Sequence, residues 1–372
     1  MAPRIKLMLL IPHLGGGGAE RVTTLLTRHL DRTRFEIDLI IFTKDKSGAQ
    51  PPPVWVRVTR FETRRVRHAL PHLIRVIHTR QPDVILSGMA HLNFLVLLLK
   101  PLLPRRTAIL ARQNTTASSA AKTWLSRLPY RRIYSYADTI ICQSQAMASD
   151  LAINFRLPKS KLAVLANPVC GSTFATAENS CQINWPANSW PRILSVGRLS
   201  QEKGQDLLLQ AFHAIRQQYP RAHLQILGEG PEETALRAFT QKLSLEVAVT
   251  FTGHRQNPAE FYPGTTLFVL ASRYEGMPNA MLEAAAAGMP IVATPCSGGV
   301  SDLLRDAPGT WLTSDISADS LAETVLAALA ELVHPPVTPR RFRHAFMAPF
   351  ELDTAVAAYA ALIEQAAIRK KP

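Results

Sequence analysis

Short, almost wholly apolar runs alternate with helical patterns along the first half of the chain, and this alternation constrains the fold more than any other feature. Such runs are typical of parallel strands that are covered on both faces. The expected strands lie at residues 4–11, 36–42, 54–58, 84–87, 108–111 and 139–142, and the expected helices at about 68–79, 92–100, 122–136 and 146–155. Strands that alternate with helices predict a doubly wound α/β domain.

The chain is long enough for a second domain of similar size. It has 372 residues, and two domains of that size can each bury a core. A segment rich in Ser, Thr, Asn and Ala then predicts a linker. The expected divisions are a first Rossmann-like domain at 1–168, a linker at 169–190, a second domain at 191–350 and a terminal helix at 351–372.

One strand-to-helix junction in the second domain suggests a ligand site. The apolar run Leu267–Leu270 predicts a strand, and a helix is expected at about Ala280–Ala287, with Asn279 as its N-cap. Glu275 falls in the loop and Glu283 in the helix. Free amides at a helix start can hold a phosphate, so this junction suits a ligand with hydroxyls at both ends and phosphate in the middle.

Two cations follow the first strand of this domain, which is expected at residues 192–196. Arg198 and Lys203 lie five positions apart in a loop that begins at Gly197 and ends at Gly204. Arg provides a bidentate fork and Lys a mobile point charge, so the pair suits a diphosphate. Surface cations without a ligand are the alternative.

The first domain offers a glycine loop and a histidine at strand ends. Gly16 and Gly17 belong to the run after the first strand, where backbone amides can approach a phosphate or a sugar. The run lacks the G-x-G-x-x-G pattern of dinucleotide sites. His91 follows the strand at 84–87, at the sheet edge where such domains bind ligands. A functional and a structural role for His91 both remain open.

The stretch Glu-Gly-Met-Pro-Asn…Leu-Glu-Ala…Gly-Met-Pro-Ile-Val-Ala at 275–293 resembles the Glu-x7-Glu motif of retaining glycosyltransferases, in particular glycosyltransferase family 4. The Gly-Gly-Ala-Glu-Arg run at 17–21 and the loop at 197–204 are similar to other loops of this family. The resemblance covers nearly the whole chain and implies a GT-B architecture, two Rossmann-like domains that face a central cleft. Asp302 departs from the pattern, because the family usually has Glu there, and this puts a role for its side chain in doubt.

The resemblance also implies roles for the residues of these loops. The residues expected to act in catalysis are Arg198, Lys203, Glu275 and His91. The residues expected to bind the donor are Gly16, Gly17, Gly197, Gly228, His254, Arg255, Gly276, Met277, Pro278, Asn279 and Glu283. The implied reaction moves a hexose or N-acetylhexosamine from a nucleotide-sugar, expected to be a UDP-sugar, with retention of configuration. The nucleotide-sugar is then a co-substrate, and neither a metal nor another cofactor is expected.

Charge is distributed unevenly and suggests where the acceptor comes from. The net charge is +14, and residues 1–167 alone carry +17. Basic stretches at 57–80 and 122–132 mix Arg with apolar and aromatic residues, as proteins that bind an anionic membrane surface do. Solvated helix faces are the alternative, and no nucleic-acid motif is present. We therefore expect a lipid-linked or membrane-associated glycan acceptor of the cell envelope.

The remaining features concern the compartment and the competing functions. The four cysteines show no metal or redox spacing, and no apolar run is long enough to span a bilayer. We expect a cytoplasmic protein, peripheral on the inner face of the cytoplasmic membrane. Three alternatives stay open: a transferase with a soluble acceptor, a GT-B sugar-nucleotide epimerase, and a non-catalytic protein that binds sugar nucleotides.

Overall fold

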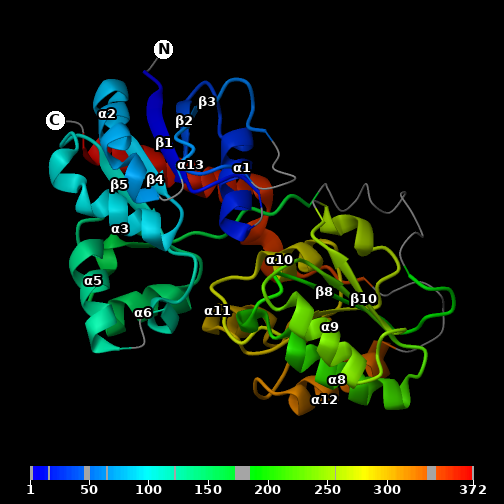
Figure 1. Ribbon diagram of the computed structural model, residues 1–372. Helices are drawn as coiled ribbons and strands as arrows, with labels where there is room; N and C mark the ends of the chain where they lie inside the picture. The colour runs from blue at the N-terminus through cyan, green and yellow to red at the C-terminus, as the bar shows by residue number, and fades with distance from the viewer. Residues whose placement is uncertain are drawn as a thin grey trace. The chain divides into compact units, whose positions relative to one another are not determined.

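Seven parallel strands form the sheet of the first structural unit. The computed structural model describes residues 3–15, 17–45, 51–63, 66–120, 123–171, 185–255, 257–332 and 341–370 (Figure 1). The strand order is β3-β2-β1-β4-β5-β6-β7. The strands are β1 (Ile5–Ile11), β2 (Phe35–Ile41), β3 (Arg57–Arg60), β4 (Val84–Ser87), β5 (Ala108–Arg112), β6 (Thr139–Cys142) and β7 (Leu162–Val164).

Helices cover both faces of this sheet, which explains why its central strands are mostly apolar and buried. In β1, Met8 and Leu10 pack in one core and Leu7 and Leu9 in another. The first core is closed by α2 (Leu70–Arg80), α3 (Ala90–Leu98), α5 (Trp124–Tyr134) and α6 (Gln145–Asn154). The second core is closed by α1 (Gly18–His29) and α13 (Leu352–Arg369). A short helix, α4 (Ala117–Ala120), and the 3-10 turns η1 (Val66–Ala69), η2 (Lys100–Leu102) and η3 (Lys159–Lys161) complete the unit.

The last helix of the chain packs on the first unit. Figure 1 draws α13 in red among the blue and cyan elements. The Tyr359 hydroxyl accepts a hydrogen bond from Nε of the buried Arg112 at 3.0 Å, and Glu364 pairs with Arg34 at 2.9 Å. Lys370, just beyond the helix, pairs with Asp138 at 3.0 Å. Three contacts therefore join α13 to elements more than 200 positions earlier in the sequence.

Six parallel strands form the sheet of the second unit, in the order β10-β9-β8-β11-β12-β13. The strands are β8 (Arg192–Val196), β9 (His223–Leu227), β10 (Val249–Gly253), β11 (Leu267–Leu270), β12 (Ile291–Ala293) and β13 (Thr310–Leu312). The helices are α8 (Gln205–Gln218), α9 (Glu233–Lys242), α10 (Asn279–Ala286), α11 (Gly298–Leu304) and α12 (Ala318–Leu332), with 3-10 turns η5 (Gln201–Lys203), η6 (Pro258–Phe261) and η7 (Ala345–Phe350). One core cluster joins α8, α9 and α12 to these strands.

Contacts divide the chain into Met1–Pro168 with Leu352–Pro372, and Val169–Glu351. Both units are parallel α/β sheets, which confirms the predicted fold class. Of the helices in the described ranges, none has both the length and the apolar composition needed to cross a bilayer.

The structure corrects three details of the sequence interpretation. The strand expected at 54–58 begins at Arg57 instead, because Val54 is fully exposed after three prolines. Pro278, not Asn279, is the N-cap of α10, so Asn279 is the first residue of that helix. Tyr130, expected among interfacial aromatics, is 7% exposed and packs on Phe94 with ring centroids 4.8 Å apart.

Candidate active site

Four loops of the second unit meet at the carboxyl ends of neighbouring strands. They follow β8, β9, β10 and β11, which lie side by side in the sheet. Backbone hydrogen bonds join the loops: Leu199 N donates to Glu229 O at 3.0 Å, Gly228 N to Gly253 O at 2.9 Å, and Arg273 N to Glu202 O at 2.8 Å. Parallel sheets bind ligands at this edge, so the fold presents these loops as one site.

Glycines allow the loops to pack backbone against backbone. A Cβ on Gly228 would lie 1.9 Å from the carbonyl oxygen of Gly197. A Cβ on Gly204, where φ is +64°, would lie 2.0 Å from the carbonyl oxygen of Ala271. No side chain fits at such distances, so these positions require glycine for the approach itself. The glycines at 204 and 228 therefore shape the site by packing, and Gly197 contributes the carbonyl oxygen that Gly228 approaches.

Lys203 and Glu275 form an ion pair in this site. The Lys203 ammonium, at the end of η5, donates to Glu275 Oε1, and the Ser272 hydroxyl donates to the same oxygen at 2.9 Å. The Lys203 side chain is 25% exposed and the Glu275 side chain 12% exposed. No hydrogen bond from the described residues ends at Glu275 Oε2, so this oxygen can accept a ligand hydroxyl. The two groups were expected to act on different parts of a ligand, and the structure places them in contact.

Arg198 is exposed in the loop that carries Lys203, and no ion pair joins its guanidinium to a described residue. Its carbonyl oxygen accepts from Gln205 Nε2 at 3.3 Å, which fixes the backbone while the side chain extends outward. An exposed guanidinium next to a half-buried ammonium is a site for an anion.

The loop before α10 and the helix itself are mostly buried. Gly276, Met277 and Pro278 are buried, and Asn279 is half-buried. Glu283, expected to bind a ribose, is 4% exposed in the middle of α10. A carboxylate so deep in a fold needs hydrogen-bond partners, which restricts how it is oriented.

His254 and Arg255 extend from the end of β10 and are both exposed. The His254 amide donates to Glu229 Oε1 at 3.1 Å, and the Arg255 guanidinium lies 5.8 Å from the ring centroid of Phe261. The carboxylate of Glu229 thus connects the loops after β9 and β10. The sequence interpretation missed this role, although Glu229 stands between Gly228 and Gly230 in the sequence.

A second missed pair lies behind Glu275. Both guanidinium Nη atoms of Arg273 donate to Asp206, at 2.7 and 2.6 Å, and Nη1 also donates to Gln201 O at 2.8 Å. Burial opposes ionisation of Asp206, but the hydrogen bond and charge of Arg273 outweigh it and lower the pKa of this carboxyl. The pair fixes the backbone on which both Ser272 and Glu275 stand. An Arg two positions before the motif Glu was the available signal.

The first unit groups three further side chains at its own sheet edge. His13 Nε2 lies 3.8 Å from Glu20 Oε1, and a Cβ on Gly17 would lie 2.4 Å from Glu20 Oε2. His91 is exposed in the first turn of α3, not in a loop. Partial burial lowers the pKa of His91, the Glu20 carboxylate raises it, and His13 lowers it. Because Gly17 has no side chain, it leaves room for the buried carboxylate of Glu20. Gly16 lies outside the described residues.

The predicted site residues thus fall into two groups. Lys203 and Glu275 come together in the second unit, Arg198 lies in the same loop as Lys203, and His91 lies in the first unit. Within the described ranges, no group of three His, Cys, Asp or Glu side chains is arranged to hold a metal ion.

Comparison with known proteins identifies the family. A model described as Glycosyltransferase Family 4 matches residues 16–170, and one described as Glycosyl transferases group 1 matches residues 182–336. An uncharacterised glycosyltransferase of Methanocaldococcus jannaschii is 31% identical over 180 residues, which are 48% of this chain and 44% of that protein. The chain thus spans less than half the length of that relative.

One further relative and one solved structure match along most of the chain. The N-acetylgalactosamine-N,N'-diacetylbacillosaminyl-diphospho-undecaprenol 4-alpha-N-acetylgalactosaminyltransferase of Campylobacter jejuni is 26% identical over 317 residues, 81% of this chain and 84% of that enzyme. The crystal structure of HepE from Anabaena, in complex with UDP and glucose, superposes with a TM-score of 0.80 at 17% identity, over 97% of this chain and all of that one. This chain belongs to the group 1, family 4 glycosyltransferases and has the GT-B fold, as its sequence predicted.

Proposed function

We propose that this protein transfers a hexose or N-acetylhexosamine from a UDP-sugar to a glycan or lipid-linked acceptor, with retention of configuration. The observation that carries the proposal is the Lys203–Glu275 pair, held beside the exposed Arg198 at one sheet edge. Two cations and a carboxylate at such a position match what a sugar diphosphate presents. The reaction needs the nucleotide-sugar as a co-substrate and, in this proposal, no metal.

The difficult step is departure of the nucleoside diphosphate, and Arg198 and Lys203 would stabilise its growing charge. Cations aimed at developing charge in a partly buried site are worth more than the same cations in water. Lys203 is already held by Glu275, which Ser272 holds in turn, so little reorganisation is needed when phosphate arrives. The first turn of α10 would add backbone amides near Gly276–Asn279.

The carboxylates are assigned to positioning and not to bond formation. Glu275 Oε2 would accept a hydroxyl of the sugar, while Oε1 stays on Lys203 and Ser272. Glu283 would hold the ribose, and the loop at Gly253–Arg255 would lie along the base. Held substrates react faster because the entropy of alignment is lost on binding and not in the reaction step. In the first unit, His91 and Gly17 would contact the transferred sugar.

A membrane-associated acceptor is supported by charge and by one relative. The net charge of residues 1–167, at +17, exceeds that of the whole chain, and the name of the Campylobacter jejuni relative includes diphospho-undecaprenol. Part of this charge is already neutralised, because Arg57, Arg60 and Arg80 pair with acidic residues. The cations left for a membrane include Arg131 and Arg132 on α5, next to the 48% exposed Leu128. In this proposal the enzyme works in the cytoplasm at the inner membrane face, on a cell-envelope polysaccharide.

The test incubates the protein with UDP-, GDP-, ADP- and dTDP-sugars and a bacterial membrane extract, and follows nucleotide release and labelled glycolipid. We expect nucleotide release from the sugar of one nucleotide only, and only with the extract present. The new glycosidic bond should have the same anomeric configuration as the donor. Lys203→Ala should lose this activity. Lys242→Ala, an exposed lysine at the end of α9, is the matched control. Turnover of donor to an isomeric nucleotide-sugar without extract would instead identify an epimerase, and binding without turnover a non-catalytic protein.

The membrane arm is tested separately by flotation with vesicles of phosphatidylglycerol and phosphatidylcholine. Binding to anionic vesicles that weakens as salt rises is expected, because screening reduces attraction between exposed charges. Absence of binding at low salt, together with transfer to a soluble acceptor, would favour the soluble-acceptor alternative.

A further inference from the structure

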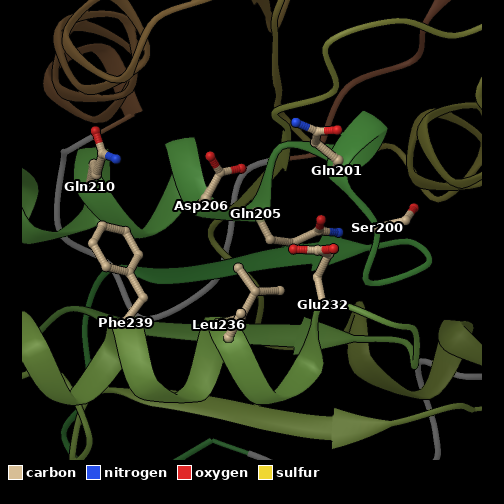
Figure 2. Close-up of a pocket in the computed structure, with 9 residues that line it drawn as sticks. Ser200, Gln201, Gln205, Asp206, Gln210, Glu232, Leu236 and Phe239 are labelled. Atoms are coloured by element: carbon tan, nitrogen blue, oxygen red, sulfur yellow. The ribbon is translucent and has the colours of Figure 1, made fainter.

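A pocket of about 330 Å³ opens between α8 and α9, on the second unit (Figure 2). Its lining residues are Ser200, Gln201, Gln205, Asp206, Gln210, Glu232, Ala235, Leu236 and Phe239. Pockets of a few hundred Å³ are in the range that binds small molecules. None of these residues is assigned a contact with the donor above, although Gln205 and Asp206 support its loops, so the pocket needs its own explanation.

The lining combines amides, carboxylates and one aromatic ring. In Figure 2, Leu236 and Phe239 extend from α9 toward α8, which carries Gln205, Asp206 and Gln210 on the opposite wall. The apolar side chains come from α9, and three of the six polar ones come from α8. Such a lining suits a ligand with one apolar face and hydrogen-bonding groups around its edge.

The lining includes a buried amide oxygen without a hydrogen-bond partner among the described residues. Gln205 is 3% exposed, and its Oε1 accepts no hydrogen bond from them, although its Nε2 donates to Arg198 O at 3.3 Å. Buried carbonyl oxygens nearly always have a donor, and leaving one without costs free energy. A turn of the Gln205 amide toward the pocket would let a ligand hydroxyl supply that donor.

The charges of the pocket favour a neutral ligand over a cation. Asp206 is already neutralised by two hydrogen bonds from Arg273. Glu232 is exposed at the pocket rim, where an isolated surface carboxylate attracts a cation only weakly. The three amides both donate and accept, and an ammonium group could use only their oxygens.

We propose that this pocket binds a neutral, hydroxyl-rich sugar ring, with one face on Phe239 and its hydroxyls on Gln205, Gln210 and Glu232. The sugar would be either a free monosaccharide or one unit of a glycan chain. Binding there would also restrain the loop of the donor site, because Gln205 holds the carbonyl of Arg198 and Asp206 holds Arg273. The proposal does not depend on transferase activity, since it concerns binding alone.

The test is saturation-transfer NMR on the full chain with glucose, galactose, N-acetylglucosamine and maltotriose, in saturating UDP to fill the donor site. A double variant, Glu232→Ala with Gln210→Ala, removes two exposed groups of the lining and leaves the core intact. The matched control is Glu246→Ala with Gln217→Ala, which changes the same residue types at exposed positions outside the lining.

We expect at least one sugar to bind with UDP present, with its affinity lowered about tenfold in the double variant and unchanged in the control. Stronger binding of maltotriose than of monosaccharides would identify a glycan chain as the source, and equal binding a free sugar. The proposal would be overturned if sugars bound equally to both variants. It would also be overturned if none of the four sugars bound with a Kd below about 1 mM. Binding of putrescine in preference to the sugars would overturn it as well.

Discussion

Gly204→Ala should destabilise the second unit by an amount that follows from local geometry. Gly204 lies between Lys203 and α8 with φ at +64°, and its Cβ would lie 2.0 Å from the carbonyl oxygen of Ala271. The left-handed conformation alone costs a residue with a Cβ about 1–2 kcal/mol. Moving packed backbone to relieve the overlap costs about 1–3 kcal/mol more. We therefore expect a loss of about 2–5 kcal/mol in the free energy of unfolding.

The assay must separate the two units, because a single melting curve mixes them. Hydrogen exchange followed by mass spectrometry reports opening free energies segment by segment. In Gly204→Ala, peptides from β8 and β11 should exchange at lower protection, while peptides from β1 and β4 in the first unit should not change. A lower Tm, by about 4–20 °C for a domain of this size, should accompany the loss.

Gly197→Ala is the matched control within the same loop. Its Cβ would meet only side-chain atoms of Lys203 and Gln205, at 3.6 and 3.7 Å, which is ordinary contact distance. The change in stability should then stay within about 0.5 kcal/mol. If both variants lose the same protection, or if neither does, the argument from the distance to the Ala271 carbonyl is refuted.

Three further predictions concern charge. Lys203→Ala should lower kcat/KM by about 10²–10³, because one donor to developing charge is lost, whereas Lys242→Ala should leave the rate unchanged in a coupled nucleotide-release assay. Glu20→Gln should lower the pKa of His91 further in an NMR titration, since the Glu20 carboxylate now raises it; an unchanged titration would show that the two groups do not interact. Burial, then Arg216 and Arg192, lowers the pKa of His223 to about 4. Its ring stays neutral in the fold but is protonated in the unfolded chain as pH falls below 6.5, so the second unit should lose up to about 3 kcal/mol between pH 6.5 and 4. In His223→Gln urea melts that loss should disappear, and its persistence would assign it to other groups.

The sequence by itself determined most of the strands, the helices between them and the fold class, although it missed β7. These follow from local rules, since a strand covered on both faces is mostly apolar, as the five buried residues of β1 are, and a helix must alternate with it to cover the sheet. The family also followed from the sequence, because the Glu-x7-Glu spacing at 275–283 is a local feature that can be recognised without the fold. The sequence predicted strand boundaries poorly where an apolar residue is exposed. Val54 was predicted to be in a strand because it is apolar, but it is fully exposed and β3 begins at Arg57.

Only the tertiary structure decided which charged groups meet. Lys203 and Glu275 are 72 positions apart, and their contact depends on the adjacency of β8 and β11 in the sheet, which no local pattern encodes. The same holds for Arg273 with Asp206, and for Arg112 with Tyr359, which are 247 positions apart. The motifs therefore predicted the site residues one by one, and only the strand order showed which of them are in contact. The physical reason is that strand order is fixed by burial over the whole sheet, whereas each motif is fixed by its own loop.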